Sequence, residues 1–150
     1  MNQETILQKL DNAIQNLMKY DRDLLIRDVN ERSITLRLAM YLQCEFPKKH
    51  VDCEFNRDHE GVKKLLCFPK RARTNDTDAR TVFPDIIVHE RKGPNLLIIE
   101  AKKSGKRELK KRCTDLQKLQ AFKDELGYEH AVFLVFHTGS NPGVEAPKFV

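Results

Sequence analysis

Residues 84–88 read PDIIV and residues 96–102 read LLIIEAK, and these two stretches decide the fold of the chain. Each is an apolar run typical of a buried β-strand. Charged side chains are rare inside buried strands unless they are paired or bind a metal. Because side chains alternate along a strand, Glu100 and Lys102 point to the same face. Asp85 joins them if the two strands form a hairpin, so that two carboxylates and an ammonium group meet at one place.

This combination of charges suits phosphate chemistry. Carboxylate oxygens are the ligands that Mg²⁺ prefers, and a neighbouring cation can stabilise charge on a phosphate. Each residue also has a simpler interpretation. Asp85 could end a turn after Pro84, because Pro-Asp is a common turn pair. Glu100 and Lys102 could form an exposed ion pair where the strand leaves the core. The apolar residues that directly precede Glu100 favour a buried, functional position.

The length and composition indicate one domain spanning residues 1–150, large enough for a hydrophobic core. Hydrophobic residues make up 40% of the chain and charged residues 33%, as is typical of a globular protein with a highly charged surface. No apolar run reaches the roughly 18 residues of a membrane span, so we expect no transmembrane helix. The N-terminal sequence lacks the basic-then-apolar pattern of a signal peptide, and we therefore expect a cytoplasmic protein.

The cysteines and glycines exclude some chemistries. No pair of cysteines has CxxC spacing, so we expect unpaired thiols that fill apolar space rather than a structural zinc site. The cysteines are Cys44, Cys53, Cys67 and Cys113. The glycines are scattered and form no phosphate-binding loop, so the sequence does not support ATP binding.

Positive charge is concentrated beside the second stretch. The formal net charge is +5, and residues 102–112 read KKSGKRELKKR, with a second basic cluster, KRAR, at residues 70–73. Phosphate backbones attract such clusters through counterion release, although a solvated surface is the common alternative. The position of the larger cluster, directly after the strand that carries Glu100, favours nucleic acid. The expected nucleic-acid-binding residues are Lys103, Lys106, Arg107, Lys70, Arg71 and Arg73.

Apolar periodicity predicts three helices and four strands. The helices are expected near residues 4–19, 29–44 and 109–126, and the strands at residues 51–57, 84–88, 96–102 and 130–136. Residues 70–81 are polar and basic and indicate an exposed loop, and the tail from residue 138 is expected to be irregular. The order helix, helix, strand, strand, strand, helix, strand predicts an α/β (α+β) protein whose mixed central β-sheet is flanked by helices.

This order, with Pro84-Asp85 and Glu100-Ala101-Lys102 on consecutive strands, resembles the PD-(D/E)xK nuclease superfamily and its restriction-endonuclease-like fold. The resemblance covers about residues 28–137 and implies an αβββαβ core, to which the first helix is an addition. It also implies hydrolysis of phosphodiester bonds with the help of a divalent metal.

The resemblance assigns a role to individual residues. Asp85 and Glu100 would bind one or two Mg²⁺ or Mn²⁺ ions, and the main-chain carbonyl of Ala101 would be a further ligand. Lys102 would position or activate the attacking water, or stabilise charge on the phosphate. A glutamate from the preceding helix often completes such a site as a metal ligand, and its best match here is Glu31.

Glu31 has two competing interpretations. It lies three residues before Ile34 and seven before Leu38, which places it on the apolar face of its helix, toward the sheet. Alternatively, Asp28 is the N-cap of the helix and Glu31 completes a capping box at the third helical position.

Three further polar residues lie near the motif in sequence or in the expected fold. Glu54 could be an accessory ligand, but we expect it to be solvated. Lys118 is expected at the surface, although related nucleases sometimes place a polar residue of this helix at the site. His89 ends the strand that begins beside Asp85, and we expect an ordinary structural histidine there.

The leading hypothesis is a metal-dependent endonuclease that cuts DNA. The first alternative is a non-catalytic nucleic-acid-binding or assembly module with the same fold. The second is an interaction domain whose basic patch binds an acidic protein. A homodimer or a larger nuclease assembly stays open, because the helix at residues 4–19 could form an interface. We expect that helix to pack on the sheet of its own chain instead.

Overall fold

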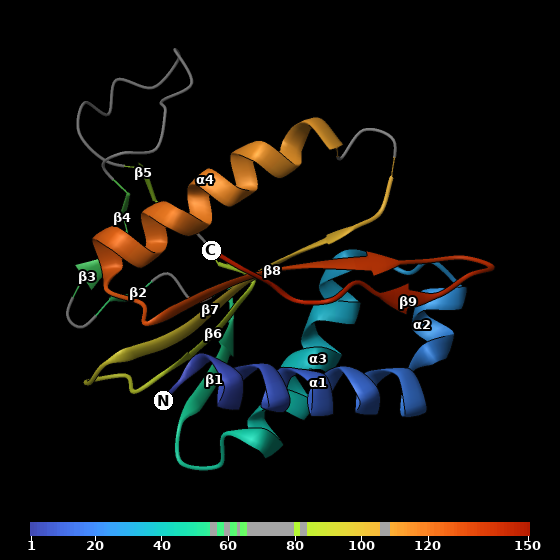
Figure 1. Cartoon of the computed structure of the whole chain (residues 1–150), viewed down its shortest axis with the longest axis horizontal. Coiled ribbons are helices and arrows are strands. Elements are labelled where there is room, and N and C mark those ends of the chain that lie inside the picture. The colour runs from blue at the N-terminus through green and yellow to red at the C-terminus, as the bar shows by residue number, and fades with distance from the viewer. Residues whose placement is uncertain (55–56, 59–60, 63, 66–79, 82–83, 106–108) are drawn as a thin grey trace.

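A mixed β-sheet with the strand order β1-β6-β7-β8-β10 forms the centre of the fold, and β9 also pairs with β8 (Figure 1). The computed structural model describes residues 1–54, 57–58, 61–62, 64–65, 80–81, 84–105 and 109–150, with side chains in 1–54, 84–105 and 115–150. The strands of the sheet are β1 (His50–Cys53), β6 (Ile86–His89), β7 (Asn95–Lys103), β8 (His130–His137), β9 (Gly143–Val144) and β10 (Lys148–Phe149). This arrangement confirms the predicted class of a mixed sheet flanked by helices.

The strands that carry the motif form the predicted hairpin. β6 and β7 are antiparallel, and Ile86 lies opposite Ile99. The turn between them closes where the Gly93 amide donates a 2.9 Å hydrogen bond to the Glu90 carbonyl. β8 then runs parallel to β7 after a crossover through α4 (Leu109–Leu126), whose bounds agree with the prediction.

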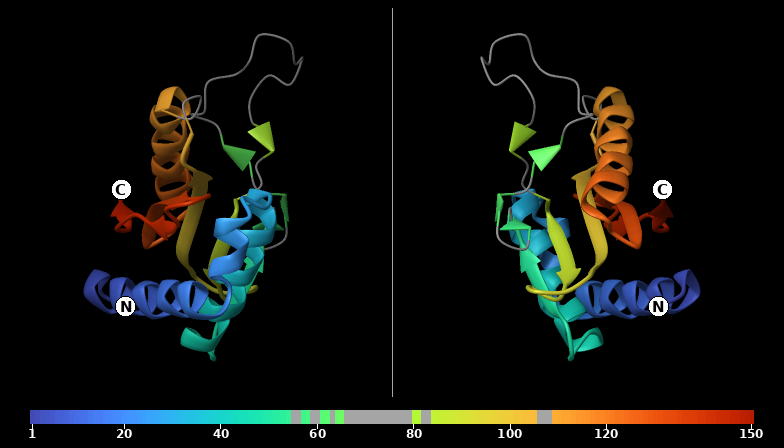
Figure 2. Two further views of the ribbon diagram at one scale, coloured as in Figure 1. Left: turned by 90° about the vertical axis from the view of Figure 1, so that its right-hand side faces the viewer. Right: turned by 90° about the vertical axis from the view of Figure 1, so that its left-hand side faces the viewer.

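Helices cover both faces of the sheet. α1 (Gln3–Tyr20), the short α2 (Arg22–Ile26) and α3 (Glu31–Glu45) pack on one face, and α4 packs on the other. In both views of Figure 2, α3 (cyan to teal) and α4 (orange) lie on opposite sides of the yellow strands of the sheet. The sheet is therefore the middle layer of three, which explains why its central strands are apolar on both faces.

Alternation along the central strands divides the core into two clusters. Ile99 and Ala101 belong to the cluster beneath α1 and α3, whereas Ile98 belongs to the cluster beneath α4. Burying a large aliphatic side chain stabilises a fold by about 1.5–3 kcal/mol, so both helical layers are held mainly by these contacts. Ala101 thus packs in the core on the face opposite Glu100, as the sequence predicts.

The start of α3 differs from the expected one. The helix begins at Glu31, and Asn30 is its N-cap, because the Asn30 Oδ1 atom accepts a 2.8 Å hydrogen bond from the Ser33 amide. Asp28 has a φ of 51° and lies outside the helix. The alternative interpretation of Glu31 as part of a capping box is therefore wrong, since Glu31 occupies the first helical position and not the third.

Other predictions about boundaries were also wrong. The strand predicted over residues 51–57 ends at Cys53, where Glu54 has a φ of 50° that turns the chain out of the sheet. The tail is not irregular, because β9 and β10 pair with β8. Two short strand pairs were not predicted, and they join β2 (Arg57–Asp58) to β3 (Gly61–Val62) and β4 (Lys64–Leu65) to β5 (Arg80–Thr81). Most of the predicted loop at residues 70–81 lies outside the described residues.

The N-terminal helix packs on its own chain, as expected. Its buried residues belong to the core cluster beneath α1 and α3, and they are Ile6, Leu10, Ala13 and Leu17.

Of the two cysteines with described side chains, Cys53 is partly buried, but Cys44 is exposed and does not fill apolar space as predicted. Within the described ranges, no helix combines the length and apolar character that a membrane span requires.

Leu38 and Leu36 test the packing of α3. Leu38 is 0% exposed and Leu36 is 53% exposed, although only two residues separate them. We expect Leu38→Ala to lower the free energy of unfolding by about 2–5 kcal/mol, because it leaves a cavity in the core. Leu36→Ala should change it by less than about 0.5 kcal/mol. Urea denaturation of both variants measures the difference, and similar losses would contradict this orientation of α3.

Candidate metal-dependent active site

Asp85 and Glu100 meet at one end of the hairpin. Asp85 directly precedes β6, and the pairing of Ile86 with Ile99 brings it alongside Glu100 on β7. The Asp85 Oδ2 atom accepts a 2.8 Å hydrogen bond from the Ala101 amide, which ties this carboxylate to the neighbouring strand. Sequence positions 85 and 100 are therefore adjacent in space, as a hairpin requires.

Glu100 is more deeply buried than Asp85 and Glu31. It is 1% exposed, and it lies on the face of β7 that α4 covers, because Ile98 on the same side belongs to the α4 cluster. The Lys118 Nζ atom lies 2.7 Å from the Glu100 Oε1 atom in an ion pair. The same oxygen lacks a well-directed hydrogen bond, so it retains capacity to accept another donor or a cation.

The surroundings of Glu100 favour its protonated form. Burial raises the pKa of the Glu100 carboxyl to about 8, and the negative charge of Asp85 adds to the rise. Lys118 and Lys102 oppose the rise, but they do not cancel the cost of removing the carboxylate from water.

Lys118 was predicted to be at the surface, and this prediction was wrong. Its side chain is 20% exposed and reaches from α4 to Glu100, while its ammonium lies 5.6 Å from the centre of the Phe122 ring. Lys118 and Phe122 are four residues apart, so they share a face of the helix. This spacing in the sequence was a signal that Lys118 points toward the sheet.

Lys102 stays protonated in this environment. Its ammonium lies 3.6 Å from the Glu31 Oε1 atom, and its side chain is 26% exposed. Partial burial lowers the pKa of Lys102, but the surrounding carboxylates more than compensate, so the net pKa is raised. Those carboxylates are Glu31, Asp85, Asp115 and Glu100. A lysine with a raised pKa acts as a fixed positive charge and is a poor general base.

Glu31 reaches the site from the first turn of α3. Its Oε2 atom accepts a 3.1 Å hydrogen bond from the Lys103 amide, in addition to its contact with Lys102. The Lys103 ammonium contacts the Asp28 carboxylate at 2.8 Å and the Val29 carbonyl at 3.2 Å. These contacts join the end of β7 to the loop before α3, and the expected role of Lys103 in nucleic-acid binding stays a prediction.

Among the described side chains, carboxyl groups outnumber ammonium groups at this site. Glu31, Asp85, Glu100 and Asp115 all act on Lys102, and Lys118 pairs with Glu100. No pattern in the sequence pointed to Asp115, which lies on α4 one turn before Lys118. An excess of carboxylates attracts a divalent cation.

Few oxygen ligands for a metal ion meet at the described part of this site. Among the side chains that the structure describes, no group of three or more acidic, histidine or cysteine residues is arranged to hold a metal ion. Glu31 is engaged with β7 and does not join Asp85 and Glu100 in such a group. Mg²⁺ commonly binds one or two carboxylates and keeps several waters, so Asp85 and Glu100 alone fit this ion. The roles of Glu31 and the Ala101 carbonyl as ligands stay predictions.

A pocket of about 470 Å³ opens beside these carboxylates. It is lined by Asn30, Glu31, Arg32, Thr35, Leu36, Cys53, Glu54 and Asp85. Glu54 is solvated, as expected, and pairs with Arg32 at 2.8 Å. The predicted nucleic-acid-binding residues Lys70, Arg71, Arg73, Lys106 and Arg107 lie outside the described residues.

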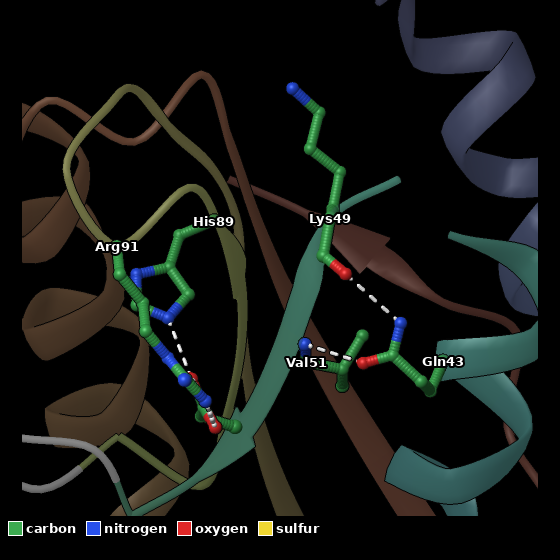
Figure 3. Close-up of polar contacts among 6 residues, drawn as sticks. Gln43, Lys49, Val51, His89 and Arg91 are labelled. Carbon is green, nitrogen blue, oxygen red and sulfur yellow. Dashed lines mark hydrogen bonds and ion pairs between the residues drawn. The ribbon is translucent and has the colours of Figure 1, made fainter. Parts of the chain in front are cut away.

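His89 is the last residue of β6, at the opposite end of the strand from Asp85. In Figure 3, the His89 side chain lies next to that of Arg91. It is 2% exposed, and its Nε2 atom lies 2.8 Å from the Asp52 carboxylate, which also binds Arg91 at 3.1 Å. Figure 3 also shows Gln43 of α3 bound to the backbone at both ends of the segment that enters β1. These contacts fix the edge strand to the hairpin and to α3.

Comparisons with protein-family models, with curated proteins and with solved structures find no match for this chain. The resemblance to PD-(D/E)xK nucleases therefore stays a prediction, which depends on the motif, on the order of elements and on the site geometry.

Glu100→Gln is expected to change how stability depends on pH. The pKa of Glu100 in the folded state, about 8, is above its ordinary value of 4.5, so the folded protein holds this proton more tightly than the unfolded chain. The wild-type free energy of unfolding should fall as the pH rises from about 4.5 to about 8, relative to the neutral Gln variant. Urea denaturation of both proteins in EDTA measures this difference, and a difference that is independent of pH would contradict the burial of an ionisable group.

Proposed function

We propose that this protein is a divalent-metal-dependent nuclease that hydrolyses phosphodiester bonds in DNA. One observation carries the proposal. The antiparallel pairing of β6 and β7 brings Asp85 and Glu100 together, with Lys102 on the same strand as Glu100. Two adjacent carboxylates can hold a divalent ion, and a neighbouring cation can stabilise charge on a phosphate, so the group suits metal-assisted phosphoryl chemistry. We expect this activity in the cytoplasm.

Asp85 and Glu100 would hold the ion. A bound Mg²⁺ or Mn²⁺ would neutralise charge on the phosphate and lower the pKa of a water molecule. The hydrogen bond from the Ala101 amide to Asp85 orients this carboxylate before any ion arrives. Such preorganisation lowers the cost of binding, because the ligand does not have to be ordered at that moment.

Lys102 would supply positive charge to the substrate. Its raised pKa keeps it protonated, so its ammonium can donate hydrogen bonds to a non-bridging phosphate oxygen. Glu31 contacts this ammonium and the backbone amide of the next residue, and it therefore acts as a positioning residue for Lys102. Lys118 lies 2.7 Å from Glu100 on the α4 side, and its ammonium favours the ionised form of Glu100 that would bind the metal.

The alternative is a nucleic-acid-binding module with the same fold and no catalytic activity. One observation favours it, because the described acids do not include a group of three that could hold a metal. The two proposals differ in whether the chain binds a divalent ion and whether it cuts DNA.

Cleavage of DNA tests the nuclease directly. Wild type should cut plasmid or single-stranded DNA with Mg²⁺ or Mn²⁺ and not with EDTA. Asp85→Asn and Lys102→Met should each lower the rate by about 100-fold or more, as removal of a group that stabilises transition-state charge does. Asp124→Asn is the matched control, since this acid lies toward the far end of α4. Full activity in both site variants would refute the proposed site.

Thermal unfolding with added metal tests the ligands without any substrate. A ligand that binds only the folded state at about 100 times its Kd stabilises it by about 2.7 kcal/mol, so Mg²⁺ should raise the Tm of the wild type. The rise should be lost in Asp85→Asn and kept in Asp124→Asn. An unchanged Tm at high Mg²⁺ and Mn²⁺ concentrations would favour the non-catalytic module.

A further inference from the structure

The pocket beside Asp85 has a mixed lining that suits one class of ligand. Its volume of about 470 Å³ lies within the range of roughly 300–1,000 Å³ that is usual for small-molecule sites. Glu31 and Asp85 line it, so it opens directly onto the proposed active site. Thr35 and Leu36 of α3 and Cys53 at the end of β1 supply an apolar wall.

The charges around the pocket determine what can enter it. Among the described side chains that line it, three are acids, Glu31, Glu54 and Asp85, and one is a base, Arg32. A phosphate group would be repelled from this interior, whereas a neutral, flat group with N–H donors could bind to the carboxylates and stack against Leu36. The Arg32 side chain is 79% exposed, and its ion pair with Glu54 is a surface pair that costs little to exchange.

We propose that this pocket receives one unpaired nucleobase of the DNA whose phosphodiester lies at Asp85 and Lys102. This inference rests on the proposed function and names its substrate class, single-stranded or branched DNA. In an intact duplex each base is stacked and paired, so it cannot enter a pocket beside the backbone unless it is flipped out, which costs a few kcal/mol. An unpaired base enters without this cost, and the apolar wall can pack against the face of that base in place of its neighbour in the stack.

Leu36 and Met40 provide a matched pair of variants. They are one turn apart on α3 and 53% and 51% exposed, but only Leu36 lines the pocket. Leu36→Glu should repel the DNA and remove the apolar contact, whereas Met40→Glu places the same charge outside the pocket. Leu36→Lys also removes the apolar contact but introduces a positive charge. Comparing it with Leu36→Glu therefore separates the loss of packing from the effect of charge.

Binding is measured by fluorescence anisotropy in EDTA, which prevents metal-dependent cleavage and leaves the lining of the pocket unchanged. The probes are a single-stranded oligonucleotide, its blunt duplex and the same duplex with an unpaired gap. We expect the single-stranded and gapped probes to bind about 10-fold more tightly than the duplex, because only the duplex has to unpair and unstack a base before that base can enter the pocket. Leu36→Glu and Leu36→Lys should each abolish this ratio, and Met40→Glu should preserve it.

The outcomes separate the two proposals. Equal affinity for all three probes, or a ratio that Leu36 variants leave unchanged, refutes the nucleobase pocket while wild-type cleavage still supports the nuclease. Wild type that neither cuts nor binds any probe refutes the proposed function itself. If Leu36→Lys weakens binding to the duplex and to the single strand equally, Leu36 contributes to DNA affinity in general. That result would also refute the nucleobase pocket.

Discussion

The antiparallel pairing of β6 with β7 is the constraint on which the rest of the structure depends. Its register places Ile86 opposite Ile99, which sends Ile99 and Ala101 into the core beneath α1 and α3. The alternate positions then face α4, and Glu100 is one of them. A shift of one residue would reverse every one of these assignments, because side chains alternate with a period of two. The same pairing that builds the core therefore brings the two carboxylates together.

The proposed site includes Glu100, an acid buried on a central strand, where a charge is unfavourable. An acid that is 1% exposed raises the free energy of the folded state unless it is protonated or compensated. Lys118 compensates Glu100 from α4, and Asp85 opposes the ionised form from β6. Residues that do not suit their local environment are found mainly at functional sites, and a buried glutamate on a central strand is such a residue. The proposed metal would relieve it.

Much of the fold could be predicted from the sequence. The helix at residues 109–126 and the hairpin strands follow from local patterns of apolar residues, which determine which face of each element is buried. The start of α3 and the end of β1 were less predictable, because Asn30 competes with Asp28 as a cap and Glu54 leaves the sheet through a positive φ. The C-terminal strands β9 and β10 have only two residues each, and their pairing with β8 leaves little trace in the sequence.

The sequence by itself determined the proximity of Asp85, Glu100 and Lys102, because a hairpin is a local structure and alternation along a strand is a property of the backbone. Only the tertiary structure decided that Lys118 reaches Glu100, that Glu31 contacts Lys102, and that a pocket opens beside them. These features need α3 and α4 to pack on opposite faces of the sheet. That packing depends on apolar contacts between distant segments, which no short stretch of sequence specifies.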